Sequence, residues 1–151
     1  MDKQLQVVDL VPLVGTVLGI SDWMVVDQPL IDAFAQVTGD HEFLHVDPVA
    51  AAATPLGGTI AHGLLTLSLL PALFNASCPR PACRMTVNYG YDAVRFLSPV
   101  PVGSRLRGAF RLVELVERKP GEWRQSVAAS VEIEGAERPA LVATWLCQHF
   151  A

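Results

Sequence analysis

The sequence predicts an α+β fold in which a curved antiparallel sheet surrounds one buried helix. Two observations carry this prediction. The segment from Thr59 to Ser77 is so rich in leucine that a helix there has no polar face, which is typical of a buried helix. From Arg84 onward, apolar and polar residues alternate in long runs, as in strands with one face on a core. At 151 residues the chain has the length of one domain, so we expect a single domain over residues 1–151.

The first element is expected to be extended, because the run GTVLGISDWMVV is rich in β-branched and aromatic residues. A helix follows, with Asp27 as its cap and Pro29 in its first turn. Gly39 is a natural C-terminal stop for that helix. Its predicted apolar face consists of Leu30, Phe34 and Val37.

Two further helices are predicted before the long strands begin. Asp47 caps a short helix that is expected to cover Pro48 to Ala53. The central leucine-rich helix comes next. Pro71 is expected to kink its last turns, because proline has no N–H to donate and its ring crowds the preceding turn.

Several long antiparallel strands make up the rest of the chain. The segment SPVPVG is a connector and KPG marks a turn. The apolar residues change phase between Leu112 and Leu115, which indicates a β-bulge near Leu112. The last strand is predicted to run from Leu141 to Phe150.

Composition narrows the class of protein. Half of the residues, 51%, are hydrophobic and only 17% are charged, which fits an oligomer that hides part of its surface. The formal charge is −4 with no basic run, so nucleic-acid binding is not expected. Three unpaired cysteines and no matched ligand pairs argue against a metal site. Without a signal-peptide pattern or a bilayer-length apolar stretch, we expect no membrane contact and a reducing, cytoplasmic location.

The stretch TGDHEFLH concentrates titratable groups in an apolar part of the chain. Asp40 and His45 converge if they lie in a loop that leaves a helix, and a carboxylate and an imidazole that share one water can activate it. The alternative is that both are ordinary cap and solvated residues. His41 and Glu42 are interpreted as solvent-exposed or as supporting residues behind the working pair.

A second candidate is GGTIAHGLL, at the start of the leucine-rich helix. Free N–H groups at a helix N-terminus can hold a developing negative charge, and Gly63 has no side chain to block a ligand. Gly63 could equally serve close packing alone. His62 either faces a ligand or stacks in the core.

Three motifs together resemble a known family: VTGDHEFLHVDPVAAA, GGTIAHGLLTLSLLP and NYGYDAVRFLSPVPVGSRLR. They are similar to those of the MaoC-like dehydratases, the (R)-specific enoyl-CoA hydratase group, and in particular its nodulation-protein-N-like branch. The resemblance covers most of the chain from Ser21 to Arg107. It implies a hot-dog fold, in which a long helix is wrapped by an antiparallel sheet, and a homodimer.

The resemblance also implies the site. The family's catalytic Asp and His correspond to Asp40 and His45, and its oxyanion-binding N–H to that of Gly63. The wider group reads Gly-Asp-x-Asn-Pro-x-His, so Glu42 replaces a neutral amide and adds negative charge near His45 if it is close. Asn88 is a further candidate for supporting the site, and His62 for contacting substrate.

The function implied is reversible addition of water to trans-2-enoyl thioesters, which gives (R)-3-hydroxyacyl thioesters. In the simplest assignment of roles, Asp40 is the base and His45 supplies or relays the proton. No metal or redox cofactor is expected. Coenzyme A or an acyl carrier enters only as part of the substrate. Two alternatives remain open: a hot-dog thioesterase, and a non-catalytic acyl-binding module.

Overall fold

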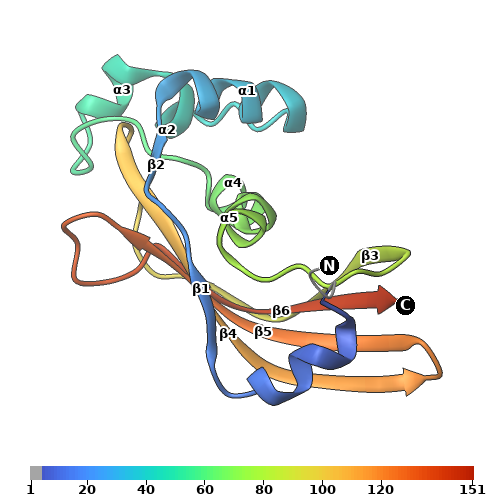
Figure 1. Ribbon diagram of the computed structural model, residues 1–151. Helices are drawn as coiled ribbons and strands as arrows, with labels where there is room; N and C mark the ends of the chain where they lie inside the picture. Colours follow the sequence, from blue (N-terminus) through green and yellow to red (C-terminus); the bar gives the residue numbers. More distant parts are fainter. Residues whose placement is uncertain (1–4) are drawn as a thin grey trace.

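The computed structural model describes residues 5–151 and shows one antiparallel sheet with helices packed on one side of it (Figure 1). The strands are β1 (Val17–Ile20), β2 (Met24–Val26), β3 (Met85–Phe96), β4 (Ser104–Lys119), β5 (Glu122–Ile133) and β6 (Leu141–Phe150). Their order is β1-β4-β5-β6-β3, and β2 pairs with residues 104–106 of β4. All pairs are antiparallel, so the predicted α+β arrangement is confirmed.

Five of the six helical elements in residues 5–151 fall into two groups. The six are η1 (Val7–Leu13), α1 (Gln28–Thr38), α2 (Phe43–Val46), α3 (Pro48–Ala52), α4 (Gly63–Ser68) and α5 (Leu70–Ser77). In Figure 1, α4 and α5 lie against the sheet, whereas α1, α2 and α3 gather beyond one end of it. Within residues 5–151, no helix is long and apolar enough to cross a membrane.

The central helix is interrupted where a kink was predicted, and it is less covered than predicted. It is interrupted at Leu69, which ends α4 and precedes α5, because Pro71 has no N–H to continue the helical ladder. The position of the kink therefore agrees with the sequence. The helix is not covered all round in a single chain, since Leu64 is 58% exposed.

The cap predictions for the N-terminal helices are confirmed. Asp27 Oδ1 accepts a hydrogen bond from Leu30 N at 3.0 Å, and Gly39 ends α1 in the left-handed region at φ 77°. Asp47 caps α3 by accepting from Val49 N and Ala50 N.

Two local predictions in this part of the chain were wrong. Val37 is 85% exposed, and the buried face of α1 is formed by Ile31 and Ala35. The single extended segment is divided into β1 and β2. Ser21 lies between them, and its hydroxyl accepts a hydrogen bond from Gly108 N at 2.9 Å.

The long strands follow the predicted pattern closely. Leu112 pairs with Val127 and Glu114 with Ser126, so Val113 is the extra residue of the predicted bulge. The turn at KPG joins β4 to β5, and Gly121 there has a φ of 76°. The last strand has the predicted bounds, Leu141–Phe150.

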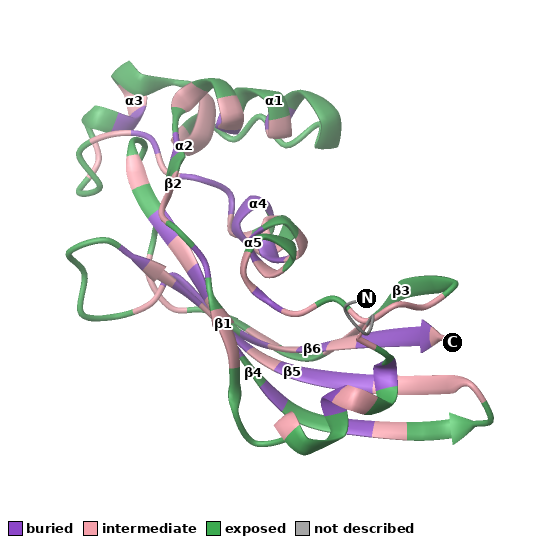
Figure 2. Cartoon of the chain, viewed as in Figure 1, coloured by how far each residue is buried: buried purple, intermediate pink, exposed green. Residues whose placement is uncertain are grey.

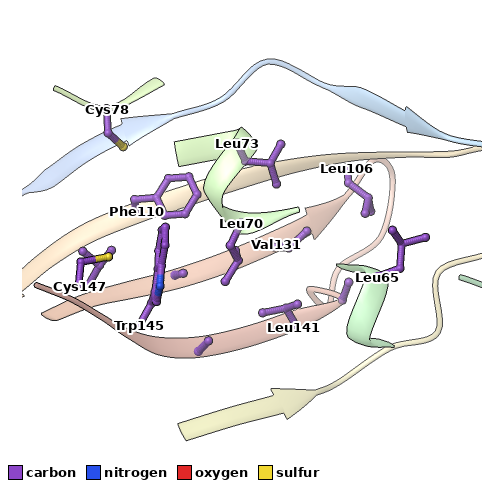
Figure 3. Close-up of a cluster of buried hydrophobic side chains, with 14 of the residues drawn as sticks. Leu65, Leu70, Leu73, Cys78, Leu106, Phe110, Val131, Leu141, Trp145 and Cys147 are labelled. Atoms are coloured by element: carbon purple, nitrogen blue, oxygen red, sulfur yellow. The ribbon is translucent and has the colours of Figure 1, made fainter. Parts of the chain in front are cut away.

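The core lies between the α4–α5 run and the inner face of the sheet. Figure 3 shows Leu65, Leu70 and Leu73 reaching from the helices toward side chains of the strands. The strand side of this core includes Leu106, Phe110, Val131, Leu141 and Trp145. Phe74 meets Phe110 and Trp145 edge to face, at ring-centroid distances of 5.1 and 5.5 Å.

One edge of the sheet is poorly covered. Among residues 5–151, β3 pairs with β6 alone, and Figure 2 shows it largely exposed while the inner strands carry buried residues. Several of its apolar side chains face solvent, among them Met85 (49% exposed), Val87 (42%), Tyr89 (59%) and Phe96 (51%). A long apolar edge strand is a typical site for pairing with another chain.

The contact between β1 and α5 generates the first prediction. A Cβ on Gly19 would lie 2.1 Å from the backbone oxygen of Ser77, so Gly19→Ala forces the strand and the helix apart. We expect a loss of about 1–3 kcal/mol in the free energy of unfolding, measured by urea denaturation. Gly58→Ala is the matched control, because a Cβ there meets nothing within 4 Å. Equal stability of the two variants would contradict this account of the contact.

Candidate active site

Asp40 and His45 come from two elements that meet at a helix end. Gly39 terminates α1, and Asp40 follows it directly in the exposed loop before α2. His45 lies within α2, a one-turn helix that was not predicted, rather than in the loop expected from the sequence. The loop is held locally, because Asp40 Oδ1 accepts a hydrogen bond from Glu42 N at 3.4 Å.

The ring of His45 is oriented by a carbonyl group. His45 Nδ1 lies 2.7 Å from the backbone oxygen of Ile60. A carbonyl oxygen only accepts hydrogen bonds, so Nδ1 carries the proton. In neutral His45 the free lone pair therefore belongs to Nε2, which makes Nε2 a proton acceptor.

His62 contacts both His45 and Asp40. Its ring stacks on that of His45 with centroids 3.8 Å apart, and its Nε2 donates to the backbone oxygen of Asp40 at 3.0 Å. The side chain is only 2% exposed and does not line the adjacent cavity. His62 thus holds Asp40 and His45 in place, and the expectation that it contacts substrate is not met in this geometry.

The three side chains form a compact group. A carboxylate oxygen of Asp40 and one ring nitrogen each of His45 and His62 lie within 4.8 Å of one another. Two groups that hydrogen-bond to one water stand about 4–5.5 Å apart, since each bond is about 2.8 Å long. The spacing therefore suits a shared water. It is also the place where residues 5–151 could hold a metal ion.

An apolar cavity of about 300 Å³ opens beside His45. Gly63 and Thr66 of α4 form part of its wall, and the connector after β3 forms another. The remaining lining residues are Ile60, Ala61, Phe96, Leu97, Ser98, Pro99, Val100 and Ala140. Asp40 is exposed and is not among these lining residues, so His45 is the ionisable group that faces the cavity.

Gly63 occupies the start of α4, where the N–H has no acceptor within the helix. A Cβ added to Gly63 would lie 3.0 Å from the Phe96 ring. The absence of a side chain therefore allows the close approach of Phe96, and Gly63 itself lines the cavity. The packing interpretation made from the sequence is thus supported, and the oxyanion-binding role of the Gly63 N–H stays a prediction.

The two remaining charged candidates in the loop are peripheral. Glu42 is exposed and begins α2, and its carboxylate makes no hydrogen bond or ion pair with any residue in the described part of the chain. His41 is also exposed. The charge of Glu42 is accordingly placed toward solvent, away from direct contact with His45.

Asn88 lies elsewhere. It is on β3, facing a second cavity of about 420 Å³ between α5 and the far ends of β5 and β6. Its Oδ1 is 4.0 Å from Cys147 Sγ, and it does not line the cavity beside His45. Within one chain, Asn88 therefore does not support Asp40 or His45.

Gln28, at the start of α1, is a positioning residue that sequence reasoning missed. Its Nε2 donates to the backbone oxygen of His45 and to Asp32 Oδ1, both at 2.7 Å. Its Oε1 accepts from the hydroxyl of Thr59, a residue only 1% exposed. Gln28 thus connects α1, α2 and the segment before α4. A polar residue directly before Pro29 reads as a helix start, so no local signal marked this role.

Comparison with known proteins identifies the family of this chain. A family model described as "MaoC like domain" matches residues 9–136. The chain belongs to the MaoC-like dehydratases. It is 43% identical over 145 residues to the 3-hydroxyacyl-thioester dehydratase Z of Mycobacterium tuberculosis, covering 96% of each chain. It is 48% identical over 145 residues to nodulation protein N of Rhizobium leguminosarum bv. viciae, covering 95% of this chain and 90% of the relative.

Solved structures confirm the hot-dog fold of this MaoC-like chain. The (R)-hydratase from A. caviae involved in PHA biosynthesis superposes with a TM-score of 0.73 at 25% identity, covering 89% of this chain and 94% of that one. The sequence-based assignment to the family and to the hot-dog fold is therefore confirmed.

The second cavity generates a prediction about pH. Burial raises the pKa of Cys147 to about 11 from an ordinary value of 9.0, because the thiolate is poorly solvated there. Between these two values the unfolded chain loses a proton that the folded chain keeps, so stability falls as pH rises from 9 to 11. Two pKa units correspond to about 2–3 kcal/mol.

Cys147→Ala should remove this part of the alkaline loss. The measurement is urea denaturation of the wild type and the variant at intervals from neutral pH to about pH 11. The difference between the two curves isolates Cys147 from other groups that titrate in this range. Parallel curves across the whole range would show that Cys147 is not the group responsible.

Proposed function

We propose that this protein reversibly adds water to trans-2-enoyl thioesters to give (R)-3-hydroxyacyl thioesters. The observation that carries the proposal is the pairing of His45 and Asp40 beside an apolar cavity whose wall includes Gly63, the first residue of α4. The name of the 43%-identical mycobacterial relative, a 3-hydroxyacyl-thioester dehydratase, supports the same reaction class.

In the proposed reaction, one water is held between Asp40 and His45. The hydrogen bond from His45 Nδ1 to Ile60 favours Nε2 as the base, in place of the simpler assignment of that role to Asp40. His45 Nε2 takes a proton from the water as oxygen bonds to C3, while Asp40 orients the water. The imidazolium then returns that proton to C2, on the same face. Water is thereby added in full and His45 is neutral again.

The electron pair of the C2–C3 double bond moves toward the thioester oxygen during this step. The resulting enolate needs a hydrogen-bond donor, and the N–H of Gly63 at the start of α4 supplies it. Loss of one such donor typically costs about 3–4 kcal/mol of barrier. The surrounding apolar residues strengthen these interactions by excluding water.

We further propose that this reaction needs no metal or redox cofactor, since proton transfer and one donor account for every step. Either coenzyme A or an acyl carrier can deliver the thioester to this site. The three free cysteines fit a reducing compartment such as the cytoplasm.

A thioesterase is the second candidate, because the same cavity would accept an acyl thioester. It would direct water at the carbonyl carbon, and the product would include a free thiol. A base and an orienting carboxylate facing one water fit addition across the alkene equally well, and the relatives named dehydratases favour that outcome.

Crotonyl-CoA distinguishes these functions. We expect the pure protein to reduce the enoyl absorbance without releasing free thiol. Thiol release would instead identify a thioesterase. Absence of both signals with acyl chains of several lengths would leave only a binding module and would reject the proposal.

Asp40→Asn and His45→Gln test the two site residues. Each should lower kcat/KM for crotonyl-CoA by at least about 100-fold, the usual contribution of general acid–base groups. His41→Gln is the matched control, because it changes an exposed histidine of the same loop and should keep near-normal activity. Full activity in either site variant would reject its assigned role.

We also propose a homodimer formed through the edge of β3. The strand has twelve residues, pairs on one side only and exposes Val87 and Tyr89, as a strand that continues into a partner's sheet would. Addition of a second strand would satisfy the backbone groups of this edge and cover its apolar side chains.

Light scattering after size-exclusion chromatography tests this assembly. The wild type should have twice the mass of one chain, and the double variant Val87→Lys, Tyr89→Lys should be monomeric because charges at a strand edge oppose pairing. Val113→Lys is the control, since Val113 is exposed to a similar degree on another strand. A monomeric wild type, or a double variant that stays dimeric, would disprove the proposed interface.

A further inference from the structure

The second cavity, about 420 Å³ in volume, has a polar floor that the proposed reaction does not use. Two rows of paired residues build this floor across three strands. Thr86 and His149 form one row, and Asn88, Cys147 and Gln125 form the next. Trp145 and Cys147 stand side by side on β6, close to the core (Figure 3).

A series of hydrogen-bonded side chains ends in this cavity. Burial lowers the pKa of His149, so the ring is neutral and has one N–H. His149 Nε2 bonds to Gln125 Oε1, which can only accept, so Nε2 carries the proton. Nδ1 then accepts from the hydroxyl of Thr86 at 2.9 Å. The series therefore runs from Thr86 through His149 to Gln125.

The amide nitrogen of Gln125, the last side chain in this series, has no hydrogen-bond partner among the described residues. Gln125 is 2% exposed and Trp145 is 4% exposed, yet Gln125 Nε2 and Trp145 Nε1 make no hydrogen bond within the described residues. Both side chains line the cavity. A buried donor without an acceptor costs about 1–3 kcal/mol, so such groups mark places where something else binds.

The charge of the cavity favours an electron-rich group. Arg80 and Arg84 contribute to its wall, and no carboxylate is among the described residues that line it. Cys147 is held as a neutral thiol by its raised pKa, so the floor carries donors and no negative charge. The volume equals that of roughly a dozen waters, far more than two donors require.

We propose that this cavity binds the oxygen-bearing end of an aliphatic chain, with the oxygen accepting from Gln125 Nε2 and Trp145 Nε1. The occupant is the far end of the acyl group of the thioester substrate, which rests on the function proposed above. The two cavities share one helical wall. Thr66 of α4 lines the first and Pro71 of α5 lines the second, so an acyl group that follows this helical run leads from one cavity toward the other.

Binding is tested first without any turnover. Each tryptophan contributes one indole N–H signal to the ¹H–¹⁵N spectrum, and Trp145→Phe identifies that of Trp145. We expect ω-hydroxyoctanoate to shift the Trp145 signal saturably, with a Kd at least about tenfold below that of octanoate, because one hydrogen bond to a buried donor is worth about that factor. Equal affinity for the two acids, or no shift of the Trp145 signal, overturns the proposal.

Variants of two glutamines sharpen this result. Gln125→Met should remove the difference between the two acids, whereas Gln148→Met should retain it. Gln148 lies next to the cavity residues on β6 but accepts from Arg124 Nε instead and does not line the cavity. If Gln125→Met lowers the unfolding temperature, Trp145→Phe supplies the same comparison through affinity measured by calorimetry. Retention of the preference in both Gln125→Met and Trp145→Phe contradicts the assignment.

Turnover then decides whether the acyl group is the occupant. The kcat/KM for ω-hydroxy-trans-2-octenoyl-CoA should exceed that for trans-2-octenoyl-CoA by about tenfold in the wild type, and the ratio should fall to near one in Gln125→Met. The free hydroxy acid could bind while the two kcat/KM values in the wild type are equal. That result would overturn the acyl assignment in favour of a separate small ligand. Failure of the proposed hydration is seen separately, as no turnover of crotonyl-CoA.

Discussion

The hydrogen bond between His45 Nδ1 and the backbone oxygen of Ile60 is the interaction on which the candidate site depends. It determines the tautomer of His45 and thereby gives Nε2 its lone pair. It also ties α2 to the segment that leads into α4, so that His45 and Gly63 line one cavity. A second bond, from Ile60 N to Leu44 O at 2.9 Å, holds the same two segments together.

One buried and one half-buried neighbour stabilise this arrangement. His62 stacks on His45 and donates to Asp40, while Gln28 donates to the backbone oxygen of His45 from the start of α1. Neither side chain lines the cavity. These contacts limit the motion of Asp40 and His45, and fixed geometry is a general requirement for acid–base chemistry. The apolar core beneath α4 and α5 provides the rigid support.

The fold was largely predictable, because its signals are local. Asp27 and Asp47 cap helices a few residues away, the phase change after Leu112 marks a bulge, and Pro71 marks the break between α4 and α5. The predictions were wrong where the tertiary environment determines the local structure or the buried face. The face of α1 depends on what packs against it, so Val37 was placed on the wrong side. The one-turn helix α2 is too short to show a periodicity.

The sequence by itself determined the family, the hot-dog fold and the candidate pair Asp40 and His45, because motif spacing and residue type depend only on neighbours along the chain. The tertiary structure decided what each side chain meets. It buried His62, turned Glu42 toward solvent and placed Asn88 in a different cavity from His45. It also joined His149 to Gln125 and Thr86 across three strands. His45 and Ile60 lie fifteen positions apart, and Thr86 and His149 lie sixty-three apart. Only the packing of the sheet and helices brings such partners within hydrogen-bond distance.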